Sequence, residues 1–312
     1  MILNDKLIKA LYDSVGIDTP AKTVLMDAAE KGKIEIVNAL LAGGADINAE
    51  YNGRTALMFA SRNGHTEVVK TLISRGADIE ATTNEGKTAL MFASRRNHSE
   101  IVEILIAHGA DIDAKENIIG GTALIFAVLN NHIEVVETLI DKGANIESAT
   151  NEGKTALMMA SCYNHLGIVK TLIETGAYIN AKSNKGLTAL MFAVIEGYTE
   201  AVKTLIYKGA DIEATINFSS GTALILAALE GQTEAVKILI KKGANINAKY
   251  NDGSTALMFA ALKGHAEIVK ILIDKGADIN AKTFITGRTA LLNAVENGHT
   301  EVVKLLKSVR AK

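Results

Sequence analysis

A repeated block of residues constrains this chain more than any other feature. The block T-A-L-M-F-A begins at Thr88, and variants of it return at intervals of 32 to 34 residues. A fixed period of this length is the signature of a solenoid, in which each copy is one supersecondary unit that stacks on its neighbours. The sequence therefore predicts one continuous array rather than the two globular domains that 312 residues would suggest. The copies start at Thr23, Thr55, Thr88, Thr122, Thr155, Thr188, Thr222, Thr255 and Thr289.

Each copy carries the signals of two short helices. Thr88 can accept a hydrogen bond from a free amide of the first turn, so it is predicted to cap a first helix over residues 89–96. A second helix is predicted over residues 100–107, where apolar residues recur at i, i+1, i+4 and i+5 and form one stripe. A glycine is predicted to end each second helix as a left-handed cap. These glycines are Gly44, Gly76, Gly109, Gly143, Gly176, Gly209, Gly243 and Gly276.

A polar segment, here called the finger, leads from each second helix to the next block. Before each new block stands a glycine, where a tight turn needs a positive φ. Three fingers are one residue longer than the others, and these three carry apolar residues, including Ile118, Phe218 and Phe284. Either these side chains fold back onto the neighbouring finger, or they make a hydrophobic contact with a ligand. The finger glycines are Gly53, Gly86, Gly121, Gly153, Gly186, Gly221, Gly253 and Gly287.

Two further motifs recur with the threonine block. G-H-x-E-x-V occurs at 64–69, 264–269 and 298–303, and G-A-D-I or G-A-N-I follows most second helices. Together these motifs resemble the ankyrin repeat family, whose 33-residue repeat carries a T-P-L-H-x-A signature. The resemblance covers residues 23–309. It implies an all-α solenoid of helix-turn-helix pairs with β-hairpin-like fingers.

The chain departs from that family signature at two positions. No copy has the proline, since alanine or Val24 stands there, and no copy has the histidine, which is replaced by Met91 or its apolar equivalents. An adaptable apolar side chain therefore takes the place of a hydrogen-bonding one. We do not expect the threonine–histidine hydrogen bonds of the family in this protein.

The two ends differ from the nine full copies. Residues 1–22 lack the threonine block and are predicted to form an N-terminal capping half-repeat. Repeats 1 to 9 occupy residues 23–312, and the last, from Thr289, is predicted to be a C-terminal cap. Its Lys307 stands where the other copies have leucine or isoleucine, and terminal repeats need a polar outer face.

The sequence offers no constellation typical of catalysis or metal binding. One histidine per copy lies near the turn between the helices, too far from the next for four to share a zinc ion, so a structural role is predicted. Cys162 has no acid or base beside it that would generate a thiolate, and phosphate-binding and zinc-protease motifs are absent. We therefore expect a protein that is not an enzyme, with no cofactor and no metal. The histidines are His65, His98, His132, His165, His265 and His299.

Charge and hydropathy set further expectations. A net charge of −2, with acidic Glu196, Glu230 and Glu296 at the ends of first helices, argues against a nucleic-acid partner. The longest apolar runs are too short to span a membrane, the start lacks the pattern of a secretory signal, and a single cysteine suits a reducing compartment. A cytoplasmic monomer is predicted, and secretion as an effector is left open.

The resemblance implies that fingers and first helices form a concave surface that binds another protein. Two positions at the end of each first helix are free of the consensus. They give a basic group followed by an apolar row, and aromatic and aliphatic finger residues could extend it. The alternative is that these side chains pad against adjacent helices. The predicted contact residues are Arg62, Arg95, Arg96, Leu129, Tyr163, Ile195, Leu229 and Leu262, with Tyr51, Ile118, Leu187, Phe218, Tyr250 and Phe284 from fingers.

These observations predict a non-catalytic protein–protein interaction scaffold. Two alternatives stay open at this point. The chain could be an inhibitor, an immunity-type protein or a secreted effector that blocks an enzyme or a host protein through the same surface. It could also be a structural or designed array with no specific ligand.

Overall fold

The structure, a computed structural model, describes residues 23–310, in which every regular element is a helix. The chain divides after Asn151 into two compact units, here called the N-terminal unit and the C-terminal unit. The predicted capping half-repeat at residues 1–22 lies outside the described residues. An all-α array of successive helix pairs, as the repeat predicts, is confirmed.

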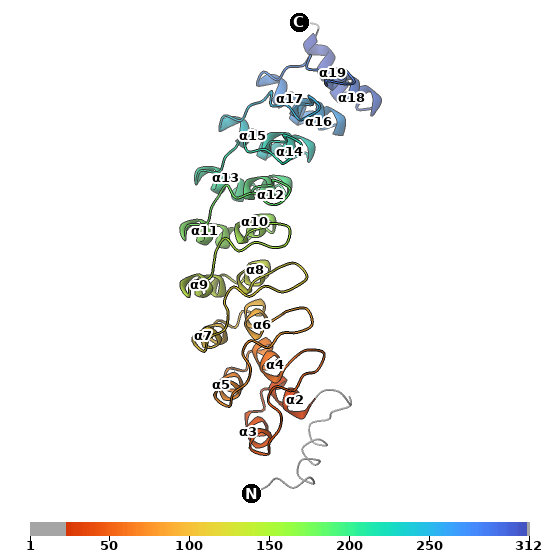
Figure 1. Ribbon diagram of the computed structural model, residues 1–312. Helices are drawn as coiled ribbons and strands as arrows, with labels where there is room; N and C mark the ends of the chain where they lie inside the picture. Colours follow the sequence, from red (N-terminus) through yellow and green to blue (C-terminus); the bar gives the residue numbers. More distant parts are fainter. Residues whose placement is uncertain (1–22, 311–312) are drawn as a thin grey trace. The chain divides into compact units, whose positions relative to one another are not determined.

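In each unit the first helices of the repeats lie side by side in one row, and the second helices lie side by side in another (Figure 1). The pairs of the N-terminal unit are α2 (Val24–Glu30) with α3 (Ile34–Ala42), α4 (Ala56–Asn63) with α5 (Thr66–Ser74), α6 (Ala89–Arg95) with α7 (Ser99–Ala107), and α8 (Ala123–Leu129) with α9 (Ile133–Asp141). Those of the C-terminal unit are α10 (Ala156–Cys162) with α11 (Leu166–Glu174), α12 (Ala189–Ile195) with α13 (Thr199–Tyr207), α14 (Ala223–Leu229) with α15 (Thr233–Lys241), α16 (Ala256–Lys263) with α17 (Ala266–Asp274), and α18 (Ala290–Glu296) with α19 (Thr300–Arg310).

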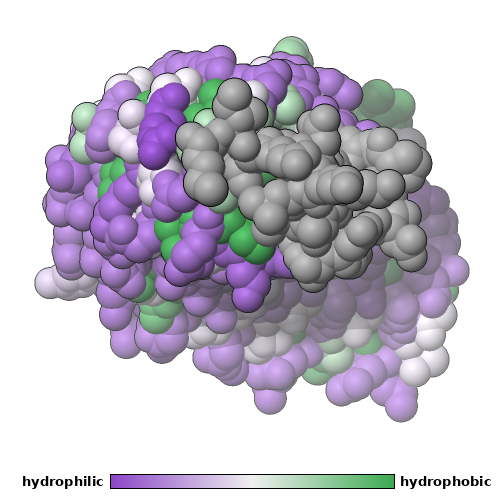
Figure 2. All heavy atoms as spheres, turned by 90° about the horizontal axis from the view of Figure 1, so that it is seen from below, coloured by the Kyte–Doolittle hydropathy of each residue, from purple (hydrophilic) through white to green (hydrophobic). Residues whose placement is uncertain are grey.

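The first helices form the core. In α6 the six residues Ala89–Ser94 are all buried, because α4 and α8 cover two sides and α7 covers a third. Met91, at the position of the family's histidine, is fully buried, as its apolar character predicts. Burying a side chain of this size contributes about 1.5–3 kcal/mol. On the face drawn in Figure 2, hydrophobic residues appear only as scattered patches among hydrophilic ones, which agrees with a core that lies between repeats.

The predicted caps are present. The Thr88 hydroxyl accepts a hydrogen bond from the Met91 amide at 3.4 Å, and the other block threonines except Thr255 make the equivalent bond. Each second helix that was predicted to end at a left-handed glycine does so, as at Gly109 with φ of 96°. The first and second helices therefore begin and end where the local signals place them.

In five of the described repeats, a histidine forms a hydrogen bond to the preceding repeat. His98 Nε2 donates to the carbonyl oxygen of Arg62, the penultimate residue of α4, at 3.1 Å. In one repeat Gln232 takes the place of histidine, and its side-chain amide donates to the Ile195 carbonyl at 2.9 Å. The predicted structural role of these histidines is confirmed where such bonds are present. The other bonds of this kind are His65 to Glu30, His132 to Arg95, His265 to Leu229 and His299 to Leu262.

Fingers are tied to one another within each unit by two sets of hydrogen bonds. At the tips, the Asn117 amide donates to the Glu85 carbonyl at 2.8 Å, and at the bases the Asp78 amide donates to the Asn48 side chain at 2.8 Å. Within residues 23–310 the fingers contain no strand, although isolated bridges are present, as between Tyr51 and Arg54, so the fingers are built from turns. The same bonds recur from repeat to repeat and fix the spacing of the fingers.

Two finger glycines do not have the predicted positive φ. Gly121 and Gly221 lie in longer fingers, where the extra residue moves the left-handed position towards the N-terminus. Gly120 takes it in the first case, and Phe218 and Ser220 take it in the second, with φ of 63° and 55°. The expected turn is therefore present, but the residue assigned to it was wrong in these two fingers.

The close approach of His98 to Gly64 gives a test of the inter-repeat contact. A Cβ on Gly64 would lie 2.6 Å from the imidazole, whereas a Cβ on Gly76 would meet nothing within 4 Å, and both glycines have positive φ. Gly76→Ala should cost about 1–2 kcal/mol of unfolding free energy through backbone strain alone. Gly64→Ala should cost about 1–3 kcal/mol more because of the steric overlap. Urea unfolding measures both, and the extra loss should vanish in a His98→Ala background; equal losses for the two glycines would contradict the contact.

His98 also predicts a pH dependence of stability. Burial lowers the pKa of its ring below the ordinary 6.5, although the hydrogen bond to the Arg62 carbonyl acts in the opposite direction. The stabilisation is therefore fully present above pH ~6.5 and is lost as the pH falls through the depressed folded-state pKa. His98→Gln, which copies the natural Gln232, keeps a donor that does not titrate. Urea unfolding between pH ~7.5 and ~5 should show a smaller loss for this variant than for the wild type, and identical losses would refute the assignment.

Candidate functional site

The ends of the first helices in the N-terminal unit carry the basic residues that the sequence singled out. Arg62 lies in the last turn of α4 and is half-buried. Arg95 ends α6 and Arg96 caps it, and both are exposed. Leu129 ends α8 and is half-buried, so it is only partly available to a ligand. The helix bodies behind them are buried, and these side chains are held at the surface by a rigid backbone.

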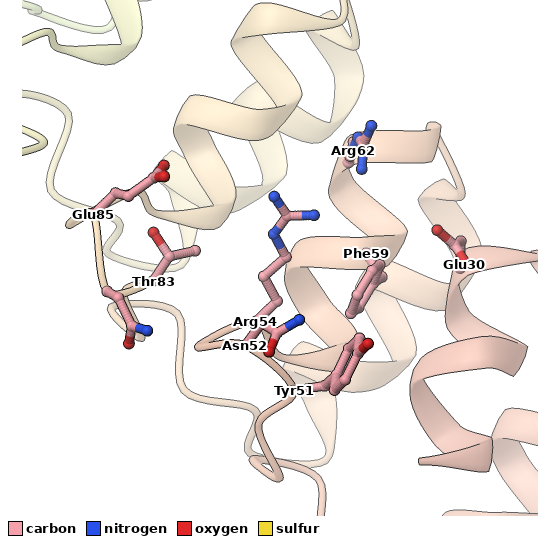
Figure 3. Close-up of a pocket in the computed structure, with 9 residues that line it drawn as sticks. Glu30, Tyr51, Asn52, Arg54, Phe59, Arg62, Thr83 and Glu85 are labelled. Carbon is pink, nitrogen blue, oxygen red and sulfur yellow. The ribbon is translucent and has the colours of Figure 1, made fainter. Parts of the chain in front are cut away.

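A cavity of about 580 Å³ lies between the fingers and first helices of the first two repeats. Tyr51 and Arg54 stand on one finger, in a turn closed by two backbone hydrogen bonds of 2.9 and 3.0 Å. Figure 3 shows the Arg54 side chain rising between Phe59 and Thr83, with its guanidinium group on the side of Arg62. The Arg54 guanidinium carbon also lies 5.5 Å from the centre of the Phe92 ring. The structure thus brings together two predicted contact residues, Tyr51 and Arg62.

The charge of this cavity differs from the predicted basic patch. Glu30 and Glu85 line the same cavity as the two arginines, which the sequence did not suggest because they lie in different repeats. Glu85 forms an ion pair with Lys87, whereas Arg54 and Arg62 form none among residues 23–310. Arg95 lies apart from the cavity, beside Phe92 and Phe126. The site therefore offers two guanidinium groups next to an aromatic wall, with carboxylates at its edges.

An apolar row marks the ends of the first helices in the C-terminal unit. Tyr163 caps α10 with 50% of its surface exposed, and its ring stacks on His165 with centroids 6.1 Å apart. Ile195, Leu229 and Leu262 are half-buried near the ends of the first helices of the following repeats, one place earlier in the repeat than Tyr163. The backbone carbonyl of each of these three accepts the inter-repeat hydrogen bond of the next repeat. The row therefore has one residue in each of four successive repeats and is partly open to solvent.

The predicted finger residues separate into two groups. Leu187 and Tyr250 are half-buried, and the Tyr250 ring meets Phe259 edge-on at 5.5 Å, so Tyr250 packs against a neighbouring helix. By contrast Ile118, Phe284 and above all Phe218 are exposed, the last to 96%. Lys249 lies 5.6 Å from the centre of the Phe284 ring. Tyr250 belongs to a finger of ordinary length. Among the longer fingers, the Phe284 ring lies close to Gly253 of the preceding finger, whereas Phe218 is not folded back.

Glu116 organises one of the longer fingers, and the sequence analysis missed it. Its carboxylate is 2% exposed and accepts hydrogen bonds from the amides of Ile118, Ile119 and Gly121, at 2.9, 2.6 and 3.1 Å. Burial acts to raise the pKa of Glu116, but these backbone donors outweigh it and lower the pKa. An ionised side chain thus holds the turn that presents Ile118. Other fingers have threonine or serine near this place, so a charged residue there was the available signal.

Cys162 is half-buried and has no activated thiol. Burial raises its pKa, and the nearby charge of Glu196 raises it further. A nucleophilic cysteine needs the opposite shift. Within the described residues no group of three or more histidine, cysteine, aspartate or glutamate side chains is arranged to hold a metal ion.

Comparison with known families agrees with this architecture. A family model described as ankyrin repeats in three copies matches residues 2–83, 25–116, 80–150, 115–183, 148–216 and 213–283, and a model of ankyrin repeats in many copies matches residues 265–306. The chain belongs to the ankyrin repeat family. Ankyrin repeats generally mediate protein–protein interaction, and ankyrin repeat proteins are typically non-catalytic. No curated protein matches the chain.

The ankyrin helices are all short. In the part of the chain that the structure describes, none is both long and apolar enough to cross a membrane.

Glu116 gives a test of how this ankyrin finger is held. Glu116→Gln should cost about 1–3 kcal/mol, because an amide cannot accept all three backbone hydrogen bonds and lacks the charge that strengthens them. Glu85→Gln, at an exposed finger carboxylate of the same unit, should cost less than about 1 kcal/mol. Hydrogen exchange at the amides of residues 118, 119 and 121 provides the local readout. Unchanged exchange in Glu116→Gln would show that the carboxylate does not hold the turn.

Proposed function

We propose that this ankyrin repeat protein is a non-catalytic scaffold that binds a partner protein through the surface shared by its fingers and first helices. Family membership supports the general role. The observation that carries the choice of surface is the partly exposed apolar row Tyr163, Ile195, Leu229 and Leu262. A face that only met solvent would have polar residues at these places, as other copies do with Asn63 and Asn130 at the position of Tyr163 and with Arg62 and Arg95 at the position of Ile195.

The proposed recognition has two chemistries. Acidic side chains of the partner pair with Arg62 in the cavity of the N-terminal unit and with exposed Arg95 and Arg96, since arginine binds carboxylates with two parallel hydrogen bonds. Apolar side chains of the partner cover the row in the C-terminal unit. Aromatic and arginine side chains are the residues most often responsible for binding energy at interfaces, which favours Tyr163 as the central contact.

The biological consequence depends on the partner. A scaffold, an inhibitor, an immunity-type protein and a secreted effector would all use the same surface. The identity of the captured partner distinguishes these roles.

The test replaces the centre of the apolar row. Tyr163→Asp with Ile195→Asp and Leu229→Asp should weaken capture of the partner at least ~100-fold, since hot-spot side chains contribute roughly 2 kcal/mol or more. Capture from lysate of the source cell, read by mass spectrometry and followed by titration calorimetry with the identified protein, measures the loss.

A matched control uses another exposed tyrosine. Tyr178 is 64% exposed and stands after a second helix of the same unit, away from the row. Tyr178→Asp should leave capture unchanged, whereas Tyr163→Asp alone should reduce it. Circular dichroism melting establishes that all variants are folded. If the triple variant captures the same protein with equal affinity, the row serves only for packing and the proposal fails.

A further inference from the structure

The second helices of the C-terminal unit carry a groove that belongs to none of the surfaces described above. Its volume is about 680 Å³, and residues of α11, α13 and α15 line it. These helices lie side by side in the row of second helices, and the apolar row belongs to the first helices (Figure 1). The groove is therefore a separate candidate for recognition.

The walls of the groove are apolar. Ile206 is buried at its base, Ile238 is half-buried, and Tyr207 at the end of α13 is 80% exposed. The repeat does not require a tyrosine at this place, because other copies have Ser74, Ala107 or Asp141 there. A large aromatic side chain left in solvent beside a hollow is typical of a binding surface.

The rim of the groove is basic. Lys170, Lys208, Lys241 and Lys242 line it and make no ion pair within residues 23–310, whereas Lys203 pairs with Glu200 at 2.6 Å. Glu174 is the one carboxylate among the lining residues that the structure describes. The groove therefore has an excess of positive charge in a protein whose net charge is −2.

Departures from the repeat consensus create this excess. In other repeats a glutamate three residues earlier neutralises the lysine, as Glu200 does for Lys203 and Glu234 does for Lys237 at 2.7 Å. Gly167 occupies that place before Lys170. Lysines at a helix C-terminus complement the helix dipole and explain Lys208 and Lys242 by themselves. Lys241 also lies in the last turn of its helix, α15, but other copies have Ser74, Ala107 or Asp141 at this place, so Lys241 is a departure from the repeat.

We propose that this groove binds an acidic segment of a partner protein that carries one large apolar side chain. The apolar side chain enters between Tyr207 and Ile238, and the flanking carboxylates pair with the lysines of the rim. Charge complementarity selects this occupant. An anionic membrane or a nucleic acid would meet the same positive rim, but its phosphate groups would not fill the apolar hollow between Tyr207 and Ile238.

The test selects ligands without assuming their sequence. The full-length protein is used to select from a random peptide library displayed on phage, in parallel with a Lys241→Glu/Lys242→Glu variant. Peptides enriched by wild type and lost with the variant should have net negative charge and at least one aromatic or large aliphatic residue. Fluorescence anisotropy with these peptides should show at least ~10-fold weaker binding to the variant and to Tyr207→Ser.

Matched control variants distinguish the groove from the rest of the protein surface. Lys275→Glu/Lys282→Glu makes the same charge change at exposed lysines outside the groove and should bind these peptides as the wild type does. The Tyr163→Asp/Ile195→Asp/Leu229→Asp variant should also bind them, so failure of the proposed scaffold surface and failure of the groove are distinguishable. Circular dichroism melting confirms the fold of each variant.

Three outcomes would overturn the proposal. The selected peptides could show no acidic preference. Wild type and Lys241→Glu/Lys242→Glu could select the same peptides. Finally, phosphatidylserine vesicles or a DNA duplex could bind wild type in a manner that depends on these lysines while no peptide does, which would assign the groove to a lipid surface or a nucleic acid.

Discussion

The structure depends on the burial of first helices that are too short to be stable alone. A helix of seven residues, such as α6, lies well below the length at which an isolated helix persists in water. Most of its residues are apolar and buried, so it lacks the polar, solvent-exposed face of an amphipathic helix. It is stable only between the first helices of two neighbours and its own second helix. The first helix of each repeat is therefore stable only when the neighbouring repeats are folded.

Hydrogen bonds between repeats convert this stacking into a defined spacing. The His98 bond to the Arg62 carbonyl fixes the distance between successive first helices, and the finger bonds fix the distance between successive turns. Neither set uses the side chains that are proposed to contact a partner. The candidate contact residues are consequently held by a backbone whose hydrogen bonds are already formed. Binding of a partner would therefore require little further ordering of the chain.

The sequence predicted what depends on one repeat at a time. Helix positions, the Thr88 cap, the Gly109 cap and the structural role of His98 follow from local chemistry, and the structure confirms them. Features that need two or more repeats could not be predicted in this way. The cavity joins Glu30 to Glu85, which lie more than one period apart.

The misassigned glycines have a similar cause. Gly121 was chosen by its place before the threonine block, but the inserted residue of that finger transfers the positive φ to Gly120. The groove at Tyr207 could not be predicted from the sequence either, because its walls come from three different copies of the repeat. The contact residues of the apolar row could be proposed from the sequence, since they stand at two adjacent repeat positions near the end of each first helix.

The carbonyl groups that accept the inter-repeat bonds belong to residues of very different kinds. Glu30, Arg62, Arg95, Ile195, Leu229 and Leu262 all occupy this place, and in each case the bond is made to the main chain. Mutation at these positions can therefore change what the surface recognises without removing the bond that joins two copies. In evolutionary terms, such a chain can acquire new specificities at these surface positions, most of which are half-buried, while selection for folding acts elsewhere. Changes in which partner is bound and conservation of the repeat fold can therefore proceed almost independently.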